Sequence, residues 1–131
     1  MTPQDASKAY LDKINRLDVH IGIYKGELTL TYKLQTEYNN APELNALLKR
    51  RRNKYARDLD KAQRQRQSII DQIDALEDPT SREILKSIYI KHQKIYAIAD
   101  RLYYGVSTIH KKQADALAEF YDKHLADSPN Q

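Results

Sequence analysis

The sequence lacks several features that would point to other classes of protein. It has no cysteine, which excludes disulfide bonds and thiolate metal sites. Only three glycines and four prolines occur in 131 residues, which disfavours a turn-rich β architecture and a disordered chain. No apolar run reaches the length of a membrane span, and the first residues contain no apolar stretch typical of a signal peptide. We therefore expect a cytoplasmic protein built from long helices.

Length and charge set the scale of the molecule. A chain of 131 residues is sufficient for one compact domain, or for an extended helical element joined to a small globular one. The formal net charge is only +4, but residues 49–66 contain nine Lys or Arg against two Asp. This segment therefore carries +7 and the rest of the chain −3, so the positive charge is concentrated in one place.

The first third of the chain has the periodicity of an amphipathic helix. Its apolar positions follow alternating steps of four and three and form one stripe, which consists of Tyr10, Ile14, Leu17, Ile21, Tyr24 and Leu28. This spacing predicts one long helix from about Asp5 to Tyr38. A local alternative exists over residues 28–34, where Leu and Tyr alternate with Thr and Lys as in a β-strand.

A second long helix is expected from about residue 41, because Asn40 is a candidate N-cap and Pro42 fits the first turn. Its seam has the same spacing, which suits an antiparallel hairpin with the first helix. The seam consists of Leu48, Arg52, Tyr55, Leu59, Ala62, Arg66, Ile69, Ile73 and Leu76. For its two arginines, either the apolar stems pack while the guanidinium groups reach water, or an exposed seam or an acidic partner accommodates them.

A boundary is expected at residues 77–78, since Asp78 is a candidate N-cap and Pro79 fits the first turn of another helix. Three short amphipathic segments follow. The fold class is therefore predicted to be all-α, with a long antiparallel helical hairpin over residues 5–77 and a small three-helix domain over residues 78–124. Residues 125–131 are polar and are expected to form a flexible tail.

The C-terminal segment has the pattern of a helix-turn-helix. Ile98, Ala99 and Leu102 share the inward face of one helix, and the tight connection Tyr103-Tyr104-Gly105 follows. Ser107-Thr108-Ile109 opens the next helix, with Ser107 as a candidate N-cap and Ile109 as the residue that locks the two helices together. Tyr104 is expected to fill the small core.

With its final pair Ala116-Leu117, this motif resembles the fourth region of bacterial sigma factors. That region has an Ile-Ala pair, a Leu three residues later, a short turn, Ser-Thr-Val or Ser-x-x-Val, and an Ala-Leu pair. Further matching residues are Tyr10-Leu11, Leu17-Asp18, residues 73–79, Arg82, Ile84-Leu85 and Tyr89-Ile90. With them, the sequence is similar to the ArpU-like and RinA-like late transcription regulators of phages and prophages of Gram-positive bacteria. The resemblance implies promoter recognition and activation of phage late genes in a bacterial cell.

Two residues depart from that family pattern. Tyr96 stands where such phage proteins usually have Trp, and Tyr103 stands at the turn position where Gly is usual. A residue other than Gly pays about 1–2 kcal/mol for a positive φ, so the turn is expected to differ locally.

The candidate DNA contacts lie on the outward face of the second helix of the motif, because a recognition helix reads base edges with its N-terminal residues. His110 and Lys111 are the main candidates, Thr108 suits a thymine methyl or a phosphate, and Ser107 either contacts DNA or only caps the helix. The remaining candidates on and beside this face are Lys112, Ala114, Lys91, His92, Lys94 and Tyr103. The last four suit phosphate contacts or simple solvation.

The concentrated positive charge forms a second candidate surface, which we call the basic stripe. It follows the four-and-three spacing on the side of the second long helix opposite the seam and consists of Arg50, Lys54, Arg57, Lys61 and Arg64. These residues span about 21 Å at 1.5 Å per residue. Like charges at this spacing repel, so the stripe is either a track for DNA phosphates or a solvated face.

No pattern in the sequence indicates catalysis. The four histidines lack a metal-binding spacing and there is no Gly-rich phosphate loop, so no enzyme activity, metal, cofactor or small-molecule substrate is expected. The expected partners are double-stranded DNA and, because the apolar seam exceeds what one hairpin covers, a second copy of the chain. The rival hypothesis is a coiled-coil interaction protein that docks on RNA polymerase or another regulator without reading DNA.

Overall fold

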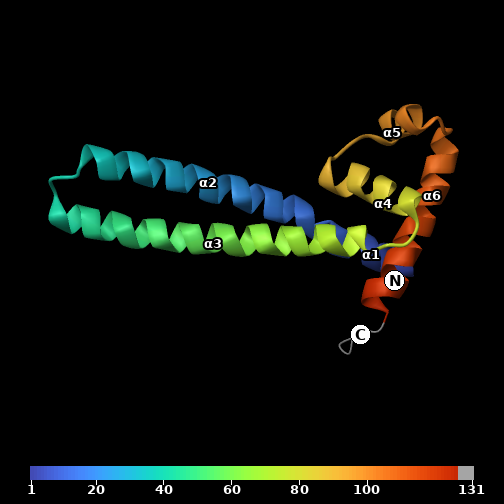
Figure 1. Cartoon of the computed structure of the whole chain (residues 1–131), viewed down its shortest axis with the longest axis horizontal. Helices are drawn as coiled ribbons and strands as arrows, with labels where there is room; N and C mark the ends of the chain where they lie inside the picture. The colour runs from blue at the N-terminus through green and yellow to red at the C-terminus, as the bar shows by residue number, and fades with distance from the viewer. Residues whose placement is uncertain (127–131) are drawn as a thin grey trace. The chain divides into compact units, whose positions relative to one another are not determined.

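The computed structural model describes residues 1–126, and every regular element in this range is helical (Figure 1). The elements are α1 (Pro3–Leu11), α2 (Lys13–Glu37), α3 (Pro42–Asp74), α4 (Pro79–Leu85), η1 (Lys86–Ile90), α5 (Ile95–Leu102), α6 (Val106–Phe120) and η2 (Tyr121–Leu125). Two of them, η1 and η2, are single-turn π-helices that continue α4 and α6. The predicted all-α class is confirmed. The tail expected over residues 125–131 lies outside the described residues from residue 127 onward.

Residues 16–66 form one compact unit, in which α2 and α3 lie antiparallel and are joined by a short loop (Figure 1). The predicted seam is confirmed in this unit, because its members are buried or half-buried. The buried members are Ile21, Leu48 and Ala62, and Thr31, one helical step beyond Leu28, is also buried. The rings of Tyr24 and Tyr55 meet across the hairpin with centroids 6.4 Å apart. The strand alternative for residues 28–34 is excluded, since they lie inside α2.

The seam arginines are accommodated in two ways. Arg66 donates from Nε to Oδ1 of Asp18 at 2.6 Å, so an acidic partner on the facing helix holds this cation. Arg52 is half-buried, as expected if its stem packs and its guanidinium group reaches water. A longer pair of 3.6 Å joins Arg51 to Glu27. The hairpin therefore places its charges at the edge of the apolar seam.

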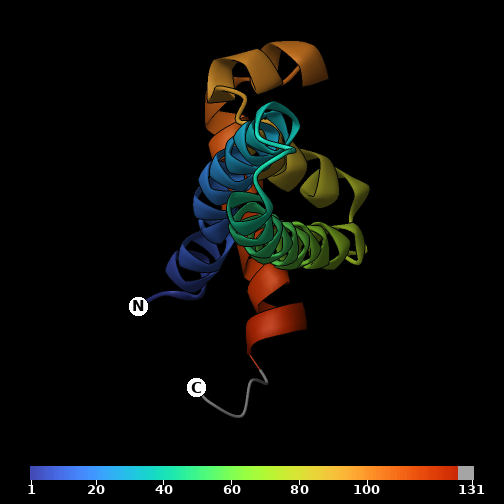
Figure 2. The ribbon, with the colours of Figure 1, turned by 90° about the vertical axis from the view of Figure 1, so that its left-hand side faces the viewer.

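The other compact unit combines residues 1–15 with the described residues from Gln67 onward, and α1 lies alongside α6 in it (Figure 2). The hydroxyl of Ser7 is buried and donates to the carbonyl of Leu117 at 2.8 Å. The rings of Tyr10 and Phe120 pack with centroids 5.7 Å apart. The end of α3 contributes the buried side chains of Ile69, Ile73 and Leu76. These two units differ from the division expected at residues 77–78, because both ends of the hairpin sequence pack with the C-terminal helices.

Local hydrogen bonds and capping residues decide where α1 ends and where α3 and α4 begin. The single helix expected over residues 5–38 is wrong, since α1 ends at Leu11 and the Asn15 amide bonds to the carbonyl of Asp12 in a tightened turn. The expected N-cap at Asn40 is also wrong, because α3 begins at Pro42 and Ala41 immediately precedes it. The Asp78 N-cap is confirmed, since its Oδ1 accepts from the amide of Thr80 at 2.9 Å.

Within residues 1–126, no helix has both the length and the apolar character that crossing a lipid bilayer requires.

Candidate nucleic-acid interface

A small core holds α5 and α6 against each other and against α4. Its buried members come from three helices and are Ile84, Ile98, Ala99 and Ile109, with Ile88, Ile95 and Leu102 packed around them. Each fully buried Ile contributes about 1.5–3 kcal/mol relative to an exposed one. The small side chain of Ala99 lies among the three buried isoleucines, where a larger one would force the helices apart. The inward set predicted from the spacing is confirmed.

The turn between α5 and α6 is closed by backbone hydrogen bonds. Tyr103 lies in the left-handed region with φ 61° and ψ 37°, so the local departure expected for a tyrosine at a usual glycine position is not found. The amide of Tyr104 donates to the carbonyl of Ala99 at 2.9 Å, and the amide of Tyr103 donates to that of Asp100 at 3.4 Å. This is the Schellman arrangement, in which glycine normally occupies the left-handed residue. The turn is therefore well formed but has a tyrosine at its strained position.

The outward face of α6 carries the principal candidate contacts. Ser107, His110 and Lys111 are exposed in its first two turns, while Thr108 and Ala114 are partly exposed. Ser107 is not the N-cap, because the helix begins at Val106 and Gly105 precedes it in an extended conformation. Gly105 has no side chain that can accept from the first-turn amides of α6.

Val106 is a further residue of this surface that the sequence pattern does not predict; it is 46% exposed at the first position of α6. Its spacing of three residues before the buried Ile109 indicates an inward position. At the very end of a helix, however, a residue has no preceding turn to pack against, so this residue remains open. An exposed aliphatic group beside polar side chains suits contact with a thymine methyl.

The two turn tyrosines lie at the surface. Tyr103 is 95% exposed, which leaves its hydroxyl accessible. The expectation that Tyr104 fills the core is wrong, since it is 40% exposed and the ammonium of Lys112 lies 5.0 Å from its ring centroid. The isoleucines already fill the space beneath the turn. Lys112 therefore covers Tyr104 and is less available than Lys111 for another partner.

The cations before α5 form the remaining part of the predicted site. Lys91 and Lys94 are exposed, and Lys94 is the N-cap residue of α5 with an extended backbone and no side-chain cap. His92 lies between them with φ 56° and is also exposed. The structure thus places the predicted cations of this loop at the surface.

A hydrogen-bond network anchors this loop and α5 to the preceding helix. The guanidinium of Arg101 donates to Oε1 of Glu83 at 2.7 Å, to Oγ of Ser87 at 2.7 Å and to Oε1 of Gln93 at 3.1 Å. The hydrogen bond from Arg101 lowers the pKa of the Glu83 carboxyl below its ordinary value. Arg101 is therefore occupied by the fold, and no local spacing in the sequence indicates this role.

The basic stripe lies on the exposed side of α3. All five of its cations are exposed, as their position opposite the seam predicts. Arg64 pairs with Asp60 at 2.8 Å, but both side chains are largely exposed, and such surface pairs contribute little. The stripe therefore presents a row of solvated positive charges along one helix.

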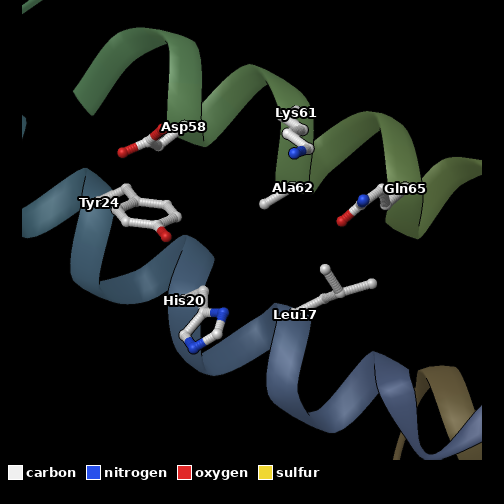
Figure 3. A pocket seen from close by; sticks show the side chains of 7 residues that line it. All are labelled: Leu17, His20, Tyr24, Asp58, Lys61, Ala62 and Gln65. Carbon is white, nitrogen blue, oxygen red and sulfur yellow. The ribbon is translucent and has the colours of Figure 1, made fainter. Parts of the chain in front are cut away.

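The hairpin unit also has an open depression of about 230 Å³ between α2 and α3 (Figure 3). Its lining residues are Leu17, His20, Tyr24, Asp58, Lys61, Ala62 and Gln65. Pockets for small ligands are usually about 300–1,000 Å³ and mostly enclosed. Among the described residues, no group of three His, Asp or Glu side chains is arranged to hold a metal ion. The depression offers no arrangement that we can connect with a reaction.

Comparison with protein-family models matches residues 46–121 to the family described as "Protein of unknown function (DUF1492)". The matched range contains the basic stripe, the turn and the whole of α5 and α6. No curated protein and no solved structure matches the chain.

Proposed function

This chain belongs to the DUF1492 family, and we propose that it is a sequence-specific DNA-binding protein that regulates transcription. One observation carries this proposal: α6 follows α5 after a closed turn, packs against it through Ile109 and presents Ser107, His110 and Lys111 outward, which is what the second helix of a helix-turn-helix motif requires. In such motifs the second helix enters the major groove with its N-terminal residues against the base edges. The protein is proposed to act through this face without catalysing a reaction.

The surroundings of α6 support the same proposal. Lys91 and Lys94 are exposed before α5 and suit phosphate contacts, which set the register of a protein on the duplex. The amides of the first turn of α6 follow Gly105 and carry the positive end of the helix dipole, to which a phosphate can be attracted. Tyr103 is nearly fully exposed and its hydroxyl can donate to a phosphate oxygen.

The kind of promoter and the further partners are proposed from the resemblance of the sequence to known families. The pattern from Ile98 to Leu117 resembles the fourth region of sigma factors, and the wider similarity is to phage and prophage late transcription regulators. We therefore propose promoters of phage late genes in a bacterial cytoplasm as the place of action, with a homodimer as the binding species and RNA polymerase as a further partner.

The test is selection of binding sites from random DNA by the full chain, followed by affinity measurement on the selected duplex. Lys111→Ala and His110→Ala should each weaken specific binding by roughly 5-fold to 150-fold, because a good base contact is worth about 1–3 kcal/mol. Their melting temperatures should hardly change, since surface substitutions usually stay within about 0.5 kcal/mol.

Lys123→Ala is the matched control, because it removes an exposed lysine from η2 beyond the recognition turns. It should leave specific affinity almost unchanged. Wild-type affinity in both α6 variants would contradict the assignment of the recognition face. Failure of the selection to enrich any sequence would reject sequence-specific binding and favour the coiled-coil interaction protein instead.

A further inference from the structure

The basic stripe is the most strongly charged surface of the hairpin unit, and it is not used by the fold. Its five cations have steps of four, three, four and three, which keeps them on one face of α3. Successive members are about 4.5–6 Å apart along the helix axis. The seam residues Leu48 and Ala62 are buried, whereas all five cations are exposed; of these, Lys61 borders the open depression between α2 and α3.

The neighbouring side chains leave this charge largely uncompensated. Within the stripe, Asn53 is exposed and neutral, and Ser68 continues the same face beyond Arg64. Asp58 and Asp60 border the stripe, so two carboxylates stand beside five cations. Asp60 pairs with Arg64, but this ion pair is exposed and can exchange for a phosphate. Repulsion between like charges at helical spacing costs stability, so the arrangement is explained if an anionic partner supplies the missing charge.

We propose that the basic stripe binds the phosphate backbone of double-stranded DNA and forms a binding surface additional to α6. This inference rests on the proposed function in one respect, because it takes DNA as the polyanion that the stripe binds. A linear row of cations suits a backbone with regularly spaced phosphates, and such contacts carry no sequence information. Arg can bind a phosphate in a bidentate manner and Lys as a point charge, so both residue types of the stripe suit this ligand. The stripe therefore supplies affinity and salt dependence, whereas α6 supplies sequence preference.

The experiment compares the full-length chain with the triple variant Lys54→Gln, Arg57→Gln and Lys61→Gln on a random-sequence duplex and on the selected site. Each lost phosphate contact should reduce the slope of log affinity against log salt by about 0.9, so the slope should flatten by roughly two to three. Between 50 and 200 mM salt, the triple variant should then lose about 40-fold less affinity than the wild type. The preferred sequence should remain the same.

A control triple removes the same charge from dispersed exposed positions: Lys8→Gln, Lys25→Gln and Lys123→Gln. Its slope should change by much less, because charges farther from DNA than the screening length of about 8 Å at 0.15 M contribute little. Circular dichroism should show the wild-type helix content for both triples, since all six substituted residues are exposed.

The outcomes separate this inference from the proposed function. Salt lines parallel to the wild type for the stripe triple, or equal flattening by both triples, would overturn the phosphate assignment while leaving α6 recognition intact. Binding of the wild type and the stripe triple to polyglutamate, a probe for acidic protein surfaces, is measured alongside. If the stripe triple loses polyglutamate binding while its DNA salt slope stays that of the wild type, the phosphate assignment is overturned in favour of an acidic protein partner. Stripe-dependent binding without any sequence preference would support the stripe and reject α6 recognition. No binding to any duplex would reject both.

Discussion

At the scale of single residues, Tyr103 holds a conformation that glycine adopts at no steric cost. A φ of 61° destabilises the folded state of a non-glycine residue by about 1–2 kcal/mol, and a glycine at this position would remove that strain. The greater conformational entropy of glycine in the unfolded chain would offset about 0.4–1 kcal/mol of this gain. Tyr103→Gly should therefore raise the stability by about 0.5–1 kcal/mol. Thermal unfolding followed by circular dichroism should show a melting temperature higher by about 2–4 °C.

Tyr103→Ala distinguishes the backbone from the side chain. This variant keeps a Cβ at the strained position and removes a ring that is 95% exposed. Its stability should remain within about 0.5 kcal/mol of the wild type. A fall in the melting temperature of the glycine variant would show that the Tyr103 ring stabilises the turn more than its strained φ destabilises it.

At the scale of elements, Arg101 connects α5 with α4, η1 and the loop between them. The carboxylate of Glu83 accepts from this guanidinium, which lowers the pKa of the Glu83 carboxyl below its ordinary value of about 4.5. Because its pKa is lower in the folded state, the ionised Glu83 carboxylate stabilises the fold, and this contribution is complete above about pH 4.5. The contribution is lost as the pH falls through the pKa that Glu83 has in the folded protein. Denaturant unfolding should therefore show stability decreasing below about pH 4.5, with a smaller decrease in Glu83→Gln.

Glu37→Gln is the matched variant, since it removes the same charge from the exposed end of α2. It should retain the full acid-dependent loss that Glu83→Gln reduces. An identical pH profile for Glu83→Gln and the wild type would show that the Arg101 bond does not contribute to the linkage between folding and proton binding.

At the scale of the whole molecule, α2 presents an apolar row that is exposed within the described residues 1–126. Val19, Ile23 and Leu30 are 61%, 53% and 49% exposed, and helical spacing places Gly26 between the last two. A Cβ on Gly22 or Gly26 would meet nothing within 4 Å, although glycine inside a helix costs about 1 kcal/mol relative to alanine. Close approach of a second chain at this row is the prediction that would account for both the exposed apolar side chains and the glycines. We expect sedimentation at micromolar concentration to give twice the 15.3 kDa of one chain.

Val19→Glu with Ile23→Glu should shift the sedimenting species toward one chain, because charge would be buried without a partner. Thr29→Glu with Thr36→Glu adds the same charge on another exposed side of α2 and should preserve the dimer. A wild-type species of 15.3 kDa would contradict the prediction. Equal dissociation by both double variants would instead point to a general charge effect.

The sequence by itself determined the features that depend on local spacing. The all-α class, the seam from Ile14 to Ile73, the inward set around Ile109 and the exposed basic stripe all follow from the 3.6-residue period of a helix. In each case the physical cause acts within a few residues of the chain.

Only the tertiary structure decided which elements pack together. The bond from Ser7 to Leu117 and the pairing of Tyr10 with Phe120 join the start of the chain to α6 across more than 100 residues, and no local pattern encodes such a contact. The same holds for the partners of Arg66 and Arg101, because an ion pair between helices depends on their register. Tyr104 remained exposed for a related reason: buried isoleucines from three helices already fill the core that a tyrosine would have entered.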